Sequence, residues 1–222
     1  MMVATEQARS MVFQAAAALD AADQGDRDAY RRVRILTPLI KFRACRDARR
    51  VAGDAMEVRG GCGYVEEWSD ARLLRDAHLG SIWEGTSNVV ALDVCRAVRR
   101  EDALPALVAQ LQTQLSEARV DDRVQGVFAT ALERTSALAR DAARPGGEAL
   151  ARQAASALYH VASAVGLAWE AERIGSPRRL LLAQLVLRHR VMARDPLAGE
   201  VPEAKWLPAL LSESASESFA LI

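Results

Sequence analysis

The sequence predicts an all-α protein, and three observations support this fold class. Hydrophobic residues make up 50% of the 222-residue chain but aromatic residues only 5%, a composition typical of close-packed helices and not of sheets rich in β-branched and aromatic side chains. Apolar residues recur at spacings of three and four along most of the chain. Glycine and proline gather in short segments between these stretches, as expected for loops that join helices.

The first 59 residues predict two helices. Residues 3–23 form an amphipathic pattern in which Ala8, Met11 and Ala15 lie on one stripe. Gly25 interrupts the pattern, and an aspartate cap then begins a longer helix that extends to about residue 59. Pro38 lies inside this second helix, so we expect the helix to kink or to open locally there.

A glycine-rich segment follows, with glycine at positions 60, 61 and 63. Glycine inside a helix costs about 1 kcal/mol relative to alanine, so this segment is predicted to be a loop. Asp70 is expected to cap a short helix over residues 71–78, and Gly80 marks the next break. A further helix is predicted from about Thr86 to Arg100, which places Glu84 at or just before its start.

Four more helices are predicted after residue 101, over residues 103–118, 123–143, 147–174 and 177–193. The loops between them are short, which indicates a bundle of antiparallel neighbours. We therefore divide the chain into residues 1–103 and an additional helical bundle over residues 104–222. The last ten residues mix serines and acids, and we expect them to be poorly ordered.

Charge and cysteine usage narrow the possible partners and compartments. Lys plus Arg is 29 and Asp plus Glu is 29, so the chain lacks the basic excess that nonspecific nucleic-acid binding requires. Charges break the apolar runs well before the roughly 18 to 20 residues that a membrane span needs. Three isolated cysteines and the absence of a leader predict a cytoplasmic protein, and three isolated histidines predict no metal site.

The segment HLGSIWEGTSNVV, residues 78–90, places Glu84 in a mostly apolar run, where a carboxylate needs a purpose or a partner. Within residues 57–96 the order is EVRGGCGY, then RLLRDA, then IWEGTSN, then a helix. These motifs, in this order and spacing, resemble the C-terminal helical domain of the acyl-CoA dehydrogenase family. The upstream TPLIKF and the bundle behind the motifs are most similar to its alkylation-response (AidB-like) branch.

The resemblance implies a flavoenzyme that oxidises an acyl-CoA thioester between its α and β carbons. Glu84 would be the catalytic base, and an apolar acyl chain closing over it would exclude water and strengthen it. Gly85 would keep the wall thin beside the substrate. The residues that match the family's FAD contacts are Glu57, Val58, Arg59, Gly60, Gly61, Thr86, Ser87 and Asn88. In the family the glycine loop reaches the flavin of a neighbouring subunit, so a homo-oligomer is expected.

Three features depart from the family pattern: Glu57 stands in place of glutamine, Arg59 in place of an apolar residue and Cys62 in place of asparagine. A carboxylate beside a pyrophosphate is unfavourable unless Arg59 compensates it. We expect no reactive chemistry at Cys62. The alternative interpretation is that the glycines only form a loop and that Glu84 is an ordinary acidic residue at the start of a helix.

Other side chains have structural alternatives. Arg75 and Asp76 are expected to form a structural ion pair, and Trp83 is either core packing or a pocket wall. A basic cluster near the end of the chain is expected to be a solvated helix face rather than a DNA contact; its members are Arg178, Arg179, Arg188 and Arg190.

The family's N-terminal helical domain, its β domain and the helix with its flavin-contacting arginine have no counterpart in these residues. We therefore expect the chain to be a fragment, a split subunit whose partner chain supplies the rest, or a remnant, and not to retain FAD alone. The alternative function is a non-catalytic helical interaction module, or a nucleic-acid-associated module of an alkylation-response protein.

Overall fold

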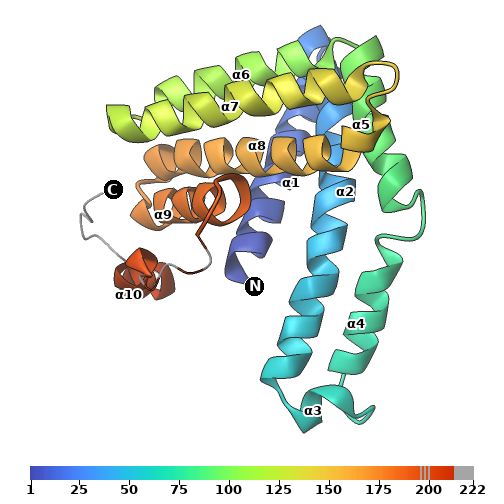
Figure 1. Cartoon of the computed structure of the whole chain (residues 1–222), viewed down its shortest axis with the longest axis vertical. Helices are drawn as coiled ribbons and strands as arrows, with labels where there is room; N and C mark the ends of the chain where they lie inside the picture. Colours follow the sequence, from blue (N-terminus) through green and yellow to red (C-terminus); the bar gives the residue numbers. More distant parts are fainter. Residues whose placement is uncertain (196, 198, 200, 213–222) are drawn as a thin grey trace.

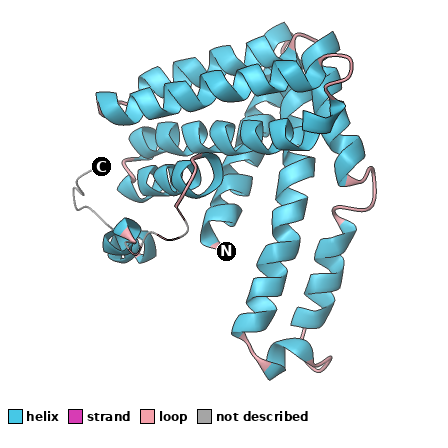
Figure 2. Ribbon diagram, in the orientation of Figure 1, coloured by secondary structure: helices cyan, strands magenta, loops and turns pink. Residues whose placement is uncertain are grey.

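The computed structural model describes residues 1–195, 197, 199 and 201–212, and these form helices and connecting loops without a strand (Figure 2). The all-α prediction is confirmed. The last ten residues, expected to be poorly ordered, lie outside the described residues. The helices are α1 (Met2–Asp23), α2 (Arg27–Val58), α3 (Gly61–Tyr64), α4 (Asp70–Leu79), α5 (Ser87–Arg100), α6 (Ala103–Glu117), α7 (Asp122–Ala143), α8 (Ala151–Ile174), α9 (Pro177–Val186) and α10 (Leu207–Leu211).

Helix α2 begins at the predicted aspartate cap and continues without interruption through its proline. The Asp26 carboxylate accepts hydrogen bonds from the backbone N–H groups of Asp28 and Ala29 at 2.8 and 2.9 Å. Pro38 is buried inside the helix, which runs for 32 residues. The expected local opening is therefore wrong: the proline removes one backbone donor, but burial of neighbours such as Leu39 holds the helix together.

The glycine segment is not a plain loop, because α3 forms one helical turn inside it. Gly60 precedes this turn with a φ of 59°, a left-handed conformation that favours glycine. A Cβ atom at Gly63 would lie 2.3 Å from the carbonyl oxygen of Met56, so only glycine allows the turn to pack on the end of α2. The prediction failed here because close backbone approach outweighed glycine's low helix propensity.

Asp70 does not cap α4 as predicted; it is the first residue of the helix, after Ser69. Its Oδ2 atom lies 3.1 Å from Nε of Arg59, so the carboxylate pairs with a side chain at the end of α2. The ion pair joins the two ends of the glycine segment. Helix α5, in contrast, begins directly after Thr86, as predicted.

Helix α8 lies at the centre of the main body, with α6 and α7 above it and α9 beside it in Figure 1. It also packs against α1, α2 and α5. One continuous hydrophobic cluster contains core residues from both predicted segments, for example Leu39 of α2 and Leu158 of α8. The division into two domains at residue 103 remains a prediction. The hydrophobic core is shared by the residues before and after this position.

Below the main body, the second half of α2 runs beside the antiparallel α4, with α3 at the tip (Figure 1). We call this projection, residues 45–79, the arm. No helix in the described part of the chain has both the length and the apolarity to cross a membrane.

Three of the four arginines near the end of the chain are bound within the protein instead of forming the predicted solvated face. Arg178 donates to the carbonyl oxygen of Leu210 at 2.9 Å, which ties α9 to α10. Arg179 pairs with Glu170, and Arg188 lies 3.2 Å from the carboxylate of Glu203. The prediction failed because α10 and the preceding turn η3 (Pro202–Trp206) supply the partners of Arg178 and Arg188, and α8 supplies Glu170 for Arg179.

Candidate active site

The connection between α4 and α5 presents Glu84. After α4, two backbone bonds form a turn, in which the N–H groups of Ile82 and Trp83 donate to the carbonyl oxygen of Leu79 at 2.9 and 3.2 Å. Gly80 allows this turn to approach α2, since a Cβ atom there would lie 3.3 Å from Sγ of Cys45. The turn therefore begins from a fixed position on α2.

Glu84 has a left-handed backbone, with a φ of 54°. This conformation is uncommon for a residue other than glycine, and such strain concentrates at functional sites. The side chain is exposed, and among the described residues it makes no hydrogen bond or ion pair. A carboxylate held by an unusual backbone but left without a partner is free to act on another molecule.

The residues on either side of Glu84 frame it. Trp83 is 56% exposed, with Nζ of Lys41 5.6 Å from the centre of its ring, so it is not core packing within the described chain. Gly85 has a φ of 109°, and a Cβ atom there would lie 3.2 Å from Cγ2 of Val90. The backbone beside Glu84 therefore requires glycine.

The start of α5 carries three predicted site residues. Thr86 occupies the N-cap position, but its side chain accepts no hydrogen bond from the first turn. Ser87 Oγ accepts a hydrogen bond of 3.2 Å from Nη1 of Arg46 on α2, and Asn88 is exposed. The first N–H groups of α5 and the nearby guanidinium make this end of the helix electropositive.

The other predicted site residues lie at the tip of the arm. Glu57 and Val58 are exposed at the end of α2, and a Cβ atom at either Gly60 or Gly61 would meet nothing within 4 Å. Arg59 pairs with Asp70 and lies 5.0 Å from the ring centre of Trp68. Its guanidinium is thus committed within the arm and is not paired with the carboxylate of Glu57.

Arg75 forms a structural ion pair, but with a different partner from the one predicted. Its guanidinium donates to both carboxylate oxygens of Glu66 at 2.8 and 3.2 Å. The hydrogen bonds from Arg75 hold the pKa of the Glu66 carboxyl below its usual value. The pairing with Asp76 is wrong because adjacent residues on a helix do not face each other.

The structure separates the predicted residues into two groups. Thr86, Ser87 and Asn88 adjoin Glu84, whereas the glycine loop lies at the opposite end of α4 (Figure 1). A helix of 10 residues is about 15 Å long, so the two groups do not form one pocket within a single chain.

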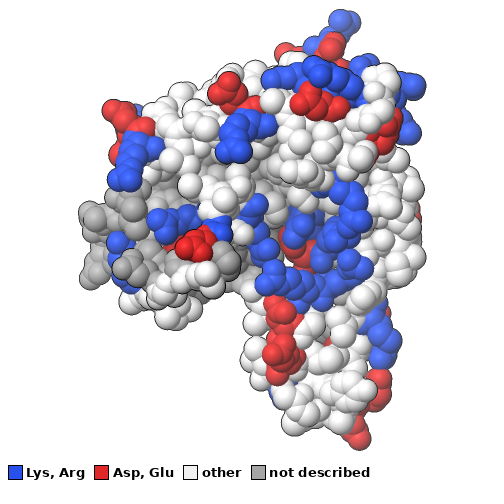
Figure 3. All heavy atoms as spheres, in the orientation of Figure 1, with Lys and Arg blue, Asp and Glu red and all other residues white. Residues whose placement is uncertain are grey.

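Basic side chains gather over the middle of α2 and the adjacent part of α8 on the face seen in Figure 3. Burial, followed by the neighbouring charges of Arg152, Arg49 and Arg43, lowers the pKa of Arg46. Asp47 lies among these arginines and is bound by Arg43 at 2.6 and 3.0 Å. This surface therefore favours an anion near Ser87.

Sequence reasoning assigned no role to Lys41 or Arg46, although Lys41 contacts Trp83 in the α4–α5 connection and Arg46 contacts Ser87 at the start of α5. Both residues lie on α2. Arg46 comes 41 positions before Ser87 in the sequence, so no local pattern joins the two. One sequence feature could have indicated that basic side chains are available to a ligand here. The run KFRACRDARR contains too many basic residues for all of them to lie on a buried helix face.

Large apolar side chains are exposed along the arm and the α4–α5 connection. Trp68 is 50% exposed, Tyr64 76% and Ile82 61%. A monomer rarely exposes several large apolar side chains along one segment, so this surface is a candidate contact with another protein or subunit.

Comparisons with known proteins show what this part of the chain is similar to. Residues 1–99 match the family model described as acyl-CoA dehydrogenase, C-terminal domain. AidB of Escherichia coli K12 is 39% identical over 77 residues, which cover 35% of this chain and 14% of AidB. Acyl-CoA dehydrogenase family member 11 of Caenorhabditis elegans is 34% identical over 126 residues, or 55% of this chain and 20% of that protein.

A solved structure of Caenorhabditis elegans ACDH-11 in complex with C11-CoA superposes with a TM-score of 0.78, at 24% identity, over 88% of this chain and 36% of that one. The likeness in fold thus extends well beyond residue 99. The chain spans only 14% of AidB and 24% of a cyclohexane-1-carbonyl-CoA dehydrogenase from Geobacter metallireducens, so it corresponds to a minor part of these relatives.

Proposed function

We propose that the chain supplies the catalytic base and part of the flavin site of an acyl-CoA dehydrogenase-like enzyme, on the basis of residues 1–99, which match the model of that family's C-terminal domain. The substrate would be an acyl-CoA thioester. The remaining flavin contacts would come from other domains, because the chain spans a minor part of its relatives.

The observation that carries this proposal is the carboxylate of Glu84. It is exposed, has no partner among the described residues, and stands on a left-handed backbone between Trp83 and Gly85. A base that removes the α proton of a thioester must reach the substrate and must not be neutralised by a neighbouring cation. Glu84 meets both requirements, and its neighbours provide an apolar ring and a thin wall.

The residues proposed for FAD fit a phosphate-bearing cofactor in two places. A Cβ atom at Gly60 or Gly61 would meet nothing within 4 Å, so a phosphate could approach the backbone there. The N–H group of Gly60 already donates to the carbonyl oxygen of Glu57 at 3.0 Å, which leaves that of Gly61 as the donor for a phosphate. The start of α5 offers uncapped N–H groups, with Arg46 bound to Ser87 beside them. When bound, the flavin would supply the acceptor for the hydride that leaves the β carbon.

Glu57 is the residue that fits least well, because its carboxylate would lie near a pyrophosphate while Arg59 is engaged with Asp70. If the loop binds phosphate, Arg59 must exchange Asp70 for the cofactor or Glu57 must turn away. The exposed position of Glu57 permits the second arrangement without loss of any packing.

We also propose that the two groups act in different subunits of an oligomer. The length of α4 separates the glycine loop from Glu84 within one chain, so each would contribute to a different flavin. The exposed apolar side chains of the arm, including Tyr64 and Trp68, support this arrangement, since docking against another subunit would bury them.

The test of the base uses this chain together with the domains that complete the flavin site, either in one polypeptide or as a purified complex. Glu84→Gln should leave flavin binding intact and should lower the exchange of the acyl-CoA α proton with deuterated solvent by about 10² to 10⁴ fold. The matched control is Glu67→Gln, an exposed acid that makes no ion pair among the described residues. Unchanged exchange in the Glu84 variant would exclude this residue as the base.

The isolated chain provides a second test. It should be folded, should self-associate through the arm, and should be colourless, because half a site loses most of the contacts that offset the entropy of holding a large cofactor. Purified chain that showed flavin absorption would contradict this expectation.

A further inference from the structure

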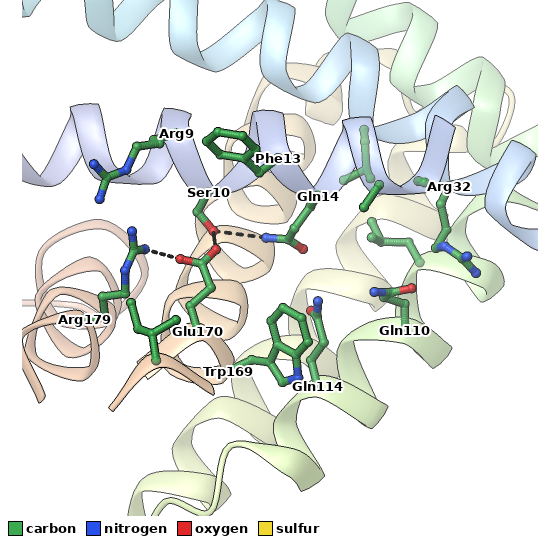
Figure 4. A pocket seen from close by; sticks show the side chains of 15 residues that line it. Arg9, Ser10, Phe13, Gln14, Arg32, Gln110, Gln114, Trp169, Glu170 and Arg179 are labelled. Carbon is green, nitrogen blue, oxygen red and sulfur yellow. Dashed lines mark hydrogen bonds and ion pairs between the residues drawn. The ribbon is translucent and has the colours of Figure 1, made fainter. Parts of the chain in front are cut away.

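A cavity of about 660 Å³ lies between α1, α2, α6 and α8, on residues that the proposed flavin and base sites do not use (Figure 4). Its size is in the range of about 300 to 1,000 Å³ that is usual for small-molecule sites. None of its lining residues lies within residues 57–88, the stretch that contains the proposed base and flavin residues. The cavity therefore needs a separate explanation.

Most of the surface that lines the cavity is apolar. Leu36 of α2 and Leu107 of α6 face it, and Trp169 of α8 contributes its indole ring. The indole is fixed, because its Nε1 donates to the carboxylate of Glu117 at 2.7 Å and the guanidinium of Arg173 lies 4.8 Å from the ring centre. Such a wall favours a ligand with an apolar body.

The polar groups at the α9 end of the cavity satisfy one another. Glu170 pairs with Arg179 and accepts a hydrogen bond of 2.6 Å from Ser10 Oγ, and Ser10 in turn accepts one of 3.2 Å from Nε2 of Gln14 (Figure 4). Arg9, which also lines the cavity, lies 2.6 Å from the carboxylate of Glu6. This end has little capacity left to bind an ionic group.

The opposite end has unused hydrogen-bonding capacity. The side chain of Gln114 is almost completely buried, with the residue 3% exposed, and its Oε1 atom has no hydrogen-bond partner. Nε of Arg32 is likewise buried without a partner, although Nη2 of the same guanidinium lies 3.4 Å from the carboxylate of Asp26. Buried polar atoms are normally paired, so these two point to a missing ligand group.

The guanidinium of Arg32 and the amide of Gln114 favour a ligand with an anionic group that has two oxygen atoms. A guanidinium offers parallel N–H donors that match a carboxylate. The two ends of a glutamine amide have the same shape, so turning the amide of Gln114 would replace its unpaired oxygen by the donor Nε2. Figure 4 shows Gln114 next to Trp169, with Gln110 between it and Arg32. Among the lining residues Glu170 alone carries a carboxylate, and it lies at the other end, while the Asp26 carboxylate pairs with Nη2 of Arg32 from outside the lining.

We propose that this cavity binds an apolar carboxylate, with its hydrocarbon part against Leu36, Leu107 and Trp169 and its carboxylate on Arg32 and Gln114. The site is independent of the flavin and base sites because it shares no residue with them. A ligand there would touch both the family-matched helices α1 and α2 and the following helices α6 and α8, and so would stabilise their contact.

The probe is decanoate, titrated below its micelle concentration into the 222-residue chain by isothermal calorimetry. We expect saturable binding of one decanoate per chain, with decanol binding at least tenfold more weakly because it lacks the charge. Arg32→Gln and Gln114→Leu should each weaken decanoate binding at least tenfold. The matched control is Arg31→Gln, since Arg31 is the neighbouring arginine on α2, pairs with exposed Asp28 and does not line the cavity.

The variant Leu107→Trp leaves Arg32 and Gln114 unchanged but fills the apolar part of the cavity. It should also abolish decanoate binding. Circular dichroism melts identify any variant that fails to fold, and the remaining variants then decide the question. The proposal is overturned if decanoate shows no saturable binding, if decanol binds as tightly, or if the folded variants of Arg32, Gln114 and Leu107 bind decanoate like the unaltered chain.

Discussion

The buried histidine of α8 makes the stability of this protein dependent on pH. His160 is 4% exposed, and its Nδ1 atom lies 3.0 Å from Nε2 of Gln7 on α1, which also donates to Ser163 Oγ at 2.7 Å. Because the amide nitrogen donates, Nδ1 accepts and the imidazole is neutral. Burial, with a smaller contribution from Arg43, lowers the pKa of His160 to about 3, against the opposing effect of Asp47.

The sign and size of the effect follow from this shift. A histidine in the unfolded chain has a pKa of about 6.5, so the unfolded state binds a proton first as the pH falls, and stability is lost between about pH 6.5 and the folded pKa of about 3. Each pH unit within this window costs about 1.4 kcal/mol. At pH 4.5 the free energy of unfolding should therefore be about 3 kcal/mol lower on account of this residue alone.

The assay is urea denaturation followed by circular dichroism at pH 7.5, 5.5 and 4.5, for the unaltered chain and for His160→Asn. Asparagine places Oδ1 where Nδ1 accepts from Gln7 and does not titrate, so the difference between the two proteins isolates the histidine from the carboxylates that also titrate. The pH-dependent loss should be about 3 kcal/mol smaller in the variant. Equal losses in the two proteins would show that His160 is not buried in its neutral form.

Three further predictions concern single elements. Gly63→Ala should expose the arm to limited proteolysis, because its Cβ would lie 2.3 Å from the carbonyl oxygen of Met56, whereas Gly61→Ala meets nothing within 4 Å and should leave cleavage unchanged. Phe128→Ala removes a side chain with 0% exposure, so urea denaturation should show a loss of about 3 to 5 kcal/mol, and a loss below about 1 kcal/mol would contradict its place in the core. Asp121→Ala removes the carboxylate that accepts from a first-turn N–H of α7 at 3.0 Å and should cost about 1 kcal/mol in the same assay, with no loss expected if the cap is unimportant.

The sequence was sufficient to predict the helices whose pattern agrees with their packing. The start of α5 after Thr86 and the aspartate cap of α2 could both be predicted because each depends on neighbouring residues. Pro38 and Gly63 show the limit of such reasoning. The helix around Pro38 persists because of burial against other helices, and the turn at Gly63 exists because of contact with the backbone of Met56.

The candidate site could be predicted as a set of residues but not as an arrangement. The motif around Glu84 is enough to select its carboxylate as the candidate base, but the left-handed backbone of Glu84 depends on how α4 ends and α5 begins. Arg46 reaches Ser87 across 41 positions of sequence, a pairing that only the tertiary fold creates. The cavity beside Arg32 and Gln114 likewise depends on helices distant in sequence, so no local motif predicts it.

The arm determines where local unfolding of the protein costs least. Helix α8 is surrounded by other helices, whereas α3 and α4 pack mainly on each other and on α2. Local opening costs least where few buried contacts are lost, so backbone amides in α3 and α4 should exchange hydrogen with solvent sooner than those in α8. The glycine loop at the tip can therefore sample several shapes, and the proposed contact with another subunit would select one of them. Formation of the proposed phosphate-binding surface would in this way depend on protein concentration.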